Sequence, residues 1–167
     1  MSHTFSSLRI HVIFSTKERK QILREELQPK LWAYMAGIAR NHKFEALKIG
    51  GTKDHCYALI LLPPPIPLSK AVQTIKGCSS KWLNETGAAG AGFAWQEGYA
   101  AFSVSASQTD CVIEYIRNQA EHHKKKNYEE EFLELLNGMA LTTIRFMCWD
   151  EWSSLRDWLI SFFGIPR

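Results

Sequence analysis

One apolar segment between two kinds of chain breaker constrains the fold of this chain more than any other feature. Residues 55–62, HCYALILL, follow the turn-like sequence GGTKD and stop at three consecutive prolines. A short apolar run suits a β-strand, and a proline run cannot continue a β-ladder. Alternate side chains of a strand share a face, so His55 and Tyr57 lie on one face, and Cys56 and Ala58 lie on the other.

Periodicity in the rest of the chain predicts further strands and helices in a definite order. The expected strands are residues 8–15, 44–49, 55–62 and a bent segment at 93–104, and the expected helices are residues 25–41, a helix from about residue 67, and residues 107–126. A turn at Gly50 and Gly51 is expected to join two of the strands as a hairpin. Ser107 is the expected N-cap of the helix that follows it. The order β α β β α β α predicts an α+β fold, a ferredoxin-like two-layer sandwich with a mostly antiparallel sheet.

The chain length of 167 residues suits one domain with a small addition. We expect residues 1–148 to form that domain and residues 149–167 to form a helical C-terminal extension. If this extension is a helix, Trp152, Leu155, Leu159 and Phe162 share one of its faces. That apolar face predicts packing on the domain itself or on a partner chain.

Composition narrows the class of protein without naming a function. An apolar fraction of 46% and a charged fraction of 22% are those of an ordinary globular protein, and the net charge of +3 permits nucleic-acid binding without requiring it. The four cysteines form no CxxC pair, which argues against a zinc ribbon or a thioredoxin-type site. We find no secretory signal and no apolar run long enough to cross a membrane, so we expect a cytoplasmic protein.

The expected helix at residues 107–126 has an apolar side and a separate polar side. Ile116 falls with the apolar residues, whereas Tyr115, Gln119 and His122 fall together on another side. One interpretation is a solvated helix face. The other is phosphodiester chemistry, because a tyrosine oxygen can attack phosphorus when a divalent ion neutralises and aligns the phosphate.

The chain resembles the single-tyrosine HUH transposases of the insertion-sequence-200 type. The similarity is carried, in order along the chain, by HVIFSTK, GGTKDHCYALILLPP, IKGCSSKWLNE, FAWQEGYAAFSVSASQ and YIRNQAEHHKKKNYEEEFLELL. It implies a ferredoxin-like fold and a homodimer in which the tyrosine helix serves its own or its partner's site. It also implies binding of single-stranded DNA hairpins, with strand cleavage and rejoining through a 5′-phosphotyrosine.

By this resemblance Tyr115 is the nucleophile, and His55 and Gln119 are ligands of a divalent metal, Mg or Mn. Tyr57 stands where the family has its second metal-binding histidine, and a neutral phenol is a poorer ligand than an imidazole. His122 or His123 can substitute as a ligand, because either lies one helical turn from Gln119. The alternative is that both histidines only extend a basic surface.

Tyr57 therefore leaves a second function open, a catalytically impaired protein that binds DNA hairpins. A ferredoxin-like RNA-binding or structural module is a third. The residues expected to contact DNA phosphates, or else to form an exposed helix face, are Lys76, Ser80, Lys81, Lys124, Lys125 and Lys126. His11, on the first strand, is expected to be packed or hydrogen-bonded, although it could neighbour His55 in the sheet.

Overall fold

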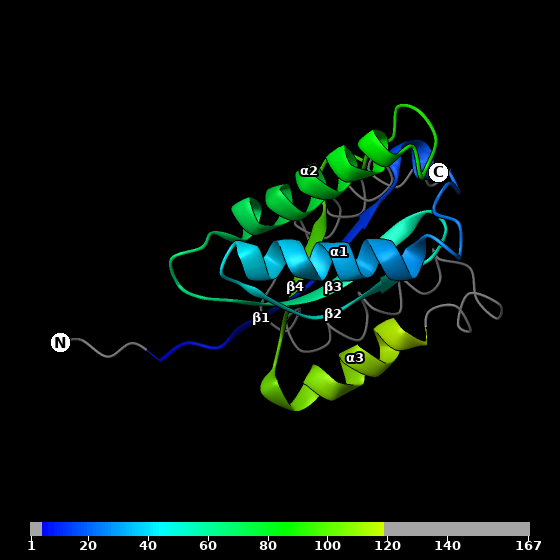
Figure 1. Ribbon diagram of the computed structural model, residues 1–167. Coiled ribbons are helices and arrows are strands. Elements are labelled where there is room, and N and C mark those ends of the chain that lie inside the picture. Colours follow the sequence, from blue (N-terminus) through cyan, green and yellow to red (C-terminus); the bar gives the residue numbers. More distant parts are fainter. Residues whose placement is uncertain (1–4, 119–167) are drawn as a thin grey trace, which may run out of the picture. The chain divides into compact units, whose positions relative to one another are not determined.

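The computed structural model of this chain describes residues 5–118 (Figure 1). The strands are β1 (Leu8–Ser15), β2 (Glu45–Gly51), β3 (His55–Leu62) and β4 (Ala100–Val104), and the helices are α1 (Gln28–Asn41), α2 (Leu68–Thr86) and α3 (Thr109–Arg117). All neighbouring strands pair antiparallel, in the sheet order β2-β3-β1-β4. The predicted α+β, ferredoxin-like class is therefore confirmed, because the element order and the interleaved sheet both have this form.

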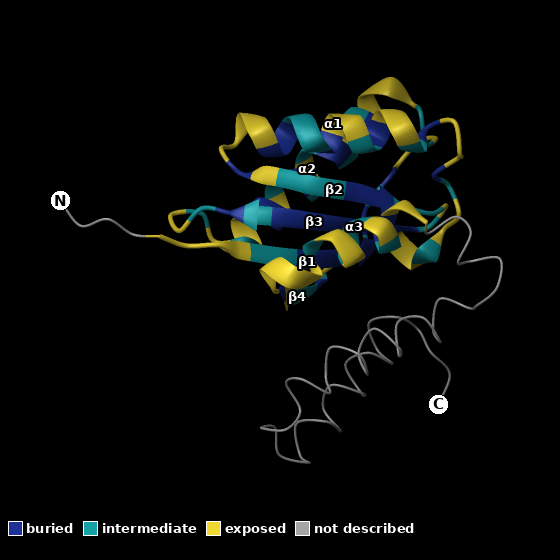
Figure 2. Ribbon diagram, turned by 90° about the horizontal axis from the view of Figure 1, so that it is seen from below, coloured by how far each residue is buried: buried dark blue, intermediate teal, exposed yellow. Residues whose placement is uncertain are grey.

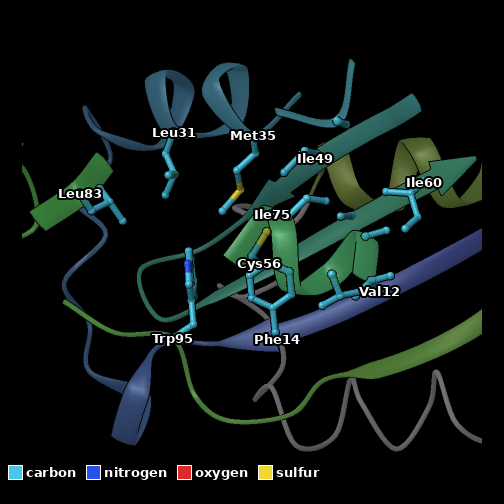
Figure 3. Packing of buried hydrophobic residues seen from close by; sticks show 14 of the residues in the cluster. Val12, Phe14, Leu31, Met35, Ile49, Cys56, Ile60, Ile75, Leu83 and Trp95 are labelled. Atoms are coloured by element: carbon cyan, nitrogen blue, oxygen red, sulfur yellow. The ribbon is translucent and has the colours of Figure 1, made fainter. Parts of the chain in front are cut away.

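Helices α1 and α2 lie side by side on one face of the sheet, and α3 lies on the opposite face (Figure 1). The main core fills the space between the sheet and the first two helices (Figure 3). Sheet and helix side chains meet there because alternate residues of each strand point the same way. Residues that form this core include Val12, Phe14, Ile49, Cys56, Ile60, Leu31, Met35, Ile75 and Leu83.

The central strand β3 is buried on both of its faces (Figure 2). Cys56, Ala58 and Ile60 face α1 and α2, and the alternate residues face the side on which α3 packs. Burial on both faces explains why this segment reads as a nearly continuous apolar run. It also means that any polar residue on the α3 side is enclosed by protein.

Two predicted features of the backbone are wrong in detail. Gly50 and Gly51 are the last residues of β2, and the turn to β3 is formed by residues 52–54. Residues 93–99 do not form the predicted strand, because the side-chain amide of Asn84 donates to the Phe93 carbonyl at 2.8 Å and accepts from the Phe93 amide at 2.8 Å. These bonds from α2 satisfy backbone groups that a sheet ladder would otherwise satisfy.

The start of α3 also differs from its prediction. Ser107 lies in a short 3-10 turn, Ala106–Gln108, and its hydroxyl contacts the Ser105 hydroxyl at 3.0 Å in place of capping the helix. The remainder of the predicted helix to residue 126, the domain boundary at 148/149 and the C-terminal extension lie outside the described residues. In the part of the chain that is described, no helix is long and apolar enough to cross a membrane.

Candidate functional site

The face of the sheet toward α3 carries buried polar side chains from β1 and β3. His55 lies opposite Ser15, and Tyr57 lies opposite Ile13 in the antiparallel register. His55, Ser15 and Tyr57 are each about 1% exposed. His55 and Tyr57 therefore share one face, as their spacing predicts, and both side chains are buried there.

Helix α3 brings Tyr115 to the same face. Ile116 is buried, and its Cγ2 atom and carbonyl oxygen both lie against Gly50 of β2. This close approach is possible because a glycine has no side chain to hold the helix away. Tyr115 is half-buried, and the centroid of its ring lies 5.7 Å from that of Tyr57. The structure thus brings together the expected nucleophile and the two strand residues.

The rings of His11, His55, Tyr57 and Tyr115 form what we call the aromatic cluster. Tyr57 is at its centre. The ring of Tyr57 lies 5.0 Å from His55 at an interplanar angle of 89°, and 5.6 Å from His11 at 28°. Edge-to-face and stacked ring pairs at such separations stabilise packing beyond the area that they bury. The phenol at position 57 consequently acts as a packing element of this face.

A hydrogen-bond network fixes the orientation of the His55 ring. Its Nδ1 lies 2.7 Å from Oδ1 of Asp54. The Thr52 hydroxyl lies 3.0 Å from the same nitrogen, and the Arg19 guanidinium donates to Oδ2 of Asp54 at 3.1 Å. A carboxylate that accepts from Nδ1 fixes the tautomer and orientation of the imidazole, with Nε2 as the nitrogen that would bind a metal, and this arrangement is common around metal-binding histidines.

Asp54 remains ionised in this network. Burial alone raises the pKa of its carboxyl, but the hydrogen bond and charge of His55, the charge of Arg19 and the hydrogen bond from Thr52 lower it well below its usual range. The pairing also fixes the turn that follows β1, where Glu18 and Arg19 have φ angles of 58° and 52°. Such left-handed backbone is unfavourable for residues other than glycine, and the contact of Arg19 with Asp54 is one of the interactions that stabilise this turn.

Asp54 and Arg19 are not among the site residues that the sequence predicts. The available signal was the carboxylate directly before the histidine, in the sequence KDH. Arg19 follows β1 and is 35 residues from Asp54. Nothing in the local sequence predicts that this pair meets.

His11 is packed, which is one of the two environments expected for this residue. It is fully buried, and within the described part of the chain neither ring nitrogen has a hydrogen-bond partner. Burial lowers the pKa of His11 to about 4, so its imidazole is neutral near pH 7. Its ring centroid is 5.6 Å from that of Tyr57 and 6.1 Å from that of Tyr115. His11 thus belongs to the same cluster without a defined polar role.

The donors that the structure describes fit a divalent metal only in part. His55 fits, because Asp54 holds its ring as a metal ligand requires. Tyr57 offers a phenol within a packed cluster in place of an imidazole, and no group of three His, Cys, Asp or Glu side chains among residues 5–118 is arranged to hold an ion. The remaining expected ligands lie outside the described residues: Gln119, His122 and His123.

Lys76, one of the residues expected to contact DNA, holds a loop in the structure. Its ammonium donates to the carbonyl of Gln96 at 2.7 Å and to that of Gly98 at 2.5 Å. Burial lowers the pKa of Lys76 to about 8, against the opposing effect of the Glu97 charge. Lys76 also lines an open groove of about 560 Å³ between α2 and residues 94–99.

Of the other residues expected to contact DNA, Ser80 and Lys81 differ in their exposure. The Ser80 hydroxyl donates to the Phe93 carbonyl at 3.2 Å, so it also positions the loop. Lys81 has 75% of its side chain exposed and lies 3.7 Å from Glu85 in a surface ion pair. Such a pair contributes little to stability, so Lys81 can readily exchange its partner for a phosphate. The three lysines at 124–126 lie outside the described residues.

One family model and several solved structures are similar to this chain. The family model described as "Transposase IS200 like" matches residues 4–119. A candidate transposase from Deinococcus radiodurans R1 has 23% identity and a TM-score of 0.56, with 71% of this chain and 95% of that chain covered. A REP-associated tyrosine transposase bound to a REP hairpin has 14% identity and a TM-score of 0.54, with 74% of each chain covered.

No curated protein matches the chain. At identities of 23% and 14%, the two structures establish similarity of fold alone. The family match is broader evidence, because it extends from residue 4 to residue 119 of 167 and includes every strand and helix described above. This chain belongs to the IS200-like transposase family.

Proposed function

We propose that this protein is a DNA strand transferase that binds single-stranded DNA hairpins and cuts and rejoins one strand through Tyr115. The observation that carries the proposal is the position of Tyr115, half-buried on α3, with its ring 5.7 Å from that of Tyr57 on the face that also holds His55. Membership of the IS200-like transposase family supports the reaction class. The hairpin in the complex of the REP-associated tyrosine transposase supports the choice of substrate.

In the proposed reaction, the phenolic oxygen of Tyr115 attacks the scissile phosphorus. The bond between phosphorus and the 3′ oxygen breaks, so the products are a 5′-phosphotyrosine and a free 3′-hydroxyl. The phenol loses one proton and the departing 3′ oxygen gains one, so the step is balanced without an added reactant. Attack by a 3′-hydroxyl on the phosphotyrosine reverses the chemistry and joins strands.

The proposal includes a divalent metal, Mg or Mn, with His55 as one ligand. Asp54 orients His55. The other proposed ligands are Gln119 and either His122 or His123. Such an ion neutralises phosphate charge and stabilises the developing charge on the oxygens when it is bound. His55 and Asp54 contribute by holding one nitrogen in a fixed direction before DNA arrives.

The second candidate function is a DNA-hairpin-binding protein with impaired catalysis. The observation that favours it is Tyr57, whose phenol stands in place of an imidazole and is packed among three rings of the cluster. A site with one strong ligand in place of two is expected to bind an ion weakly. In this case the chain would bind the hairpin and form no covalent product.

The deciding experiment mixes the full chain with labelled single-stranded hairpins from either side of its gene, in Mg²⁺ or Mn²⁺. A denaturing gel then shows any protein–DNA adduct. We expect an adduct that disappears without metal and in Tyr115→Phe. The matched control is Tyr34→Phe, on α1, because Tyr34 is partly exposed and stacks on Trp82 at 4.8 Å without touching the cluster.

Each outcome of this experiment separates the candidates. An adduct that is lost in Tyr115→Phe and kept in Tyr34→Phe supports the strand transferase. Tight binding of the hairpin without an adduct supports the impaired protein. Equal affinity for the hairpin and for an RNA of the same size would overturn both and support a general RNA-binding or structural module.

The proposed assembly is a homodimer. Family resemblance and the apolar C-terminal extension motivate it. Light scattering at tens of micromolar chain tests it directly. A monomer at that concentration would contradict the proposal.

A further inference from the structure

His11 is a buried titratable group for which the proposed chemistry has no use. Its side chain is fully enclosed, and both of its ring nitrogens lack a hydrogen-bond partner in the part of the chain that is described. Buried polar atoms are hydrogen-bonded in the great majority of cases, so each exception requires an explanation. A function that supplies a partner during the reaction is one such explanation.

The surroundings of His11 limit which group can be that partner. In the sheet, its neighbours on the two adjacent strands are Leu59 and Phe102, which have no polar side-chain atoms. Tyr57 stacks on the imidazole at an interplanar angle of 28°. Because the two rings are stacked, the Tyr57 hydroxyl lies to one side of the imidazole plane. The imidazole nitrogens of His11, in contrast, form hydrogen bonds within that plane. Tyr57 is therefore poorly placed as the partner.

Tyr115 has the required geometry. Its ring centroid lies 6.1 Å from that of His11, and the two rings are nearly perpendicular at 82°. The phenol oxygen projects beyond its own ring, so a rotation of the side chain brings an O–H···N hydrogen bond within reach at this separation. Tyr115 is also half-buried rather than fully enclosed, which leaves its ring room to rotate.

We propose that His11 is a positioning residue for the nucleophile, and that its unprotonated ring nitrogen accepts a hydrogen bond from the Tyr115 hydroxyl in the conformation from which attack occurs. The inference rests on the proposed role of Tyr115. A neutral imidazole has one acceptor nitrogen and one N–H donor, and burial keeps His11 neutral. With its proton directed to His11, the phenol oxygen presents a lone pair toward the phosphate. Stacking on Tyr57 fixes the plane of the imidazole and so fixes this direction.

The kinetic test uses three variants of the full chain with the hairpin and Mn²⁺. His11→Phe keeps a ring that can stack on Tyr57 but has no nitrogen, His11→Gln keeps a hydrogen-bond acceptor, and Phe102→Leu changes the packing beside His11. We expect His11→Phe to slow adduct formation at saturating hairpin by at least tenfold with hairpin affinity unchanged. We expect His11→Gln to recover part of that rate and Phe102→Leu to react like the wild type.

A second readout does not depend on activity. Long-range ¹H–¹⁵N NMR reports the hydrogen bonding of the His11 ring nitrogens in the wild type and in Tyr115→Phe, with and without hairpin. We expect the acceptor nitrogen to shift when the Tyr115 hydroxyl is removed. This comparison keeps His11 itself intact, so it holds even where a His11 variant fails to fold.

The outcomes separate this inference from the proposed function. If the adduct requires Tyr115 but His11→Phe reacts at the wild-type rate, the inference is overturned and the transferase remains. If the wild type forms no adduct, the NMR comparison decides alone: an unchanged His11 spectrum in Tyr115→Phe overturns the inference, and a shifted acceptor nitrogen supports it.

Discussion

The contact between Gly50 and Ile116 gives the sharpest test of how α3 is placed. A Cβ atom at position 50 would lie 2.8 Å from both Cγ2 and the carbonyl oxygen of Ile116. Ordinary contacts of a Cβ atom begin at 3.4 Å, so Gly50→Ala requires a separation larger by 0.6 Å (3.4 − 2.8). A new rotamer of Ile116 cannot relieve the contact with its own backbone. We therefore expect the whole helix to move away from β2.

The expected cost follows from overpacking. Added methyl groups in a well-packed region destabilise by about 1 to 3 kcal/mol, and we expect Gly50→Ala to lower the free energy of unfolding by that amount. The control is Gly77→Ala in α2, where an added Cβ meets nothing within 4 Å. An alanine in a helix interior is favoured over glycine by roughly 0.5 to 1 kcal/mol, so this control should stabilise.

Urea denaturation measures both variants, and the adduct assay measures the effect on Tyr115, the neighbour of Ile116. We expect Gly50→Ala to slow adduct formation and Gly77→Ala to leave it unchanged. The double variant Gly50→Ala with Ile116→Ala removes the clash with Cγ2 but not the clash with the carbonyl. The double variant should therefore lose less free energy of unfolding than the two single variants lose when their losses are added. If Gly50→Ala stabilises the protein as Gly77→Ala does, the helix does not pack on β2 as described.

Three further predictions concern the cluster and its supports. Tyr57→His should raise the affinity for Mn²⁺, measured by calorimetry, because it places a second imidazole beside His55. It should also lower the free energy of unfolding of the metal-free chain by about 1 to 3 kcal/mol, because packing around the phenol is lost. An unchanged affinity for Mn²⁺ would contradict the first expectation. Asp54→Asn should weaken Mn²⁺ binding by about 10- to 100-fold, because His55 loses its orienting carboxylate, whereas equal affinity would show that the carboxylate is not needed. Burial lowers the pKa of His11 from 6.5 to about 4, so in that range the unfolded chain binds more protons than the folded chain. Stability should therefore fall as the pH falls from 6.5 to 4, by up to roughly 3 kcal/mol (2.5 pH units at 1.36 kcal/mol each), and His11→Gln should remove this part of the pH dependence of urea denaturation.

The order of elements was predictable because it depends on local periodicity. The strands at residues 8–15 and 55–62 have the bounds that their apolar patterns predict. The segment at residues 93–99 was not predictable in this way. Its conformation depends on hydrogen bonds from the Asn84 amide and the Lys76 ammonium, both of which are on α2. Such side-chain contacts leave no periodic signal in the segment that they hold.

The site was only partly predictable for a related reason. The two-residue period of a strand places His55 and Tyr57 on one face, and the resemblance to the family predicts that Tyr115 is the nucleophile. His11 joins them through the register of β1 against β3, and Arg19 joins them from the turn that follows β1. A shift of one residue in that register would turn His11 to the opposite face. The register follows from the pairing of whole strands, so a single sequence does not display it.

The register also explains why position 57 can hold a phenol. Its ring lies between His55 on one side and His11 on the other, and Tyr115 meets it from α3. A histidine there adds a metal ligand, but it is smaller than the phenol and leaves His11 with less to stack on. Ligand strength and packing are therefore opposed at this one position. In the proposed reaction, the side chain at position 57 thus affects both how tightly an ion is held beside His55 and how well His11 can direct Tyr115.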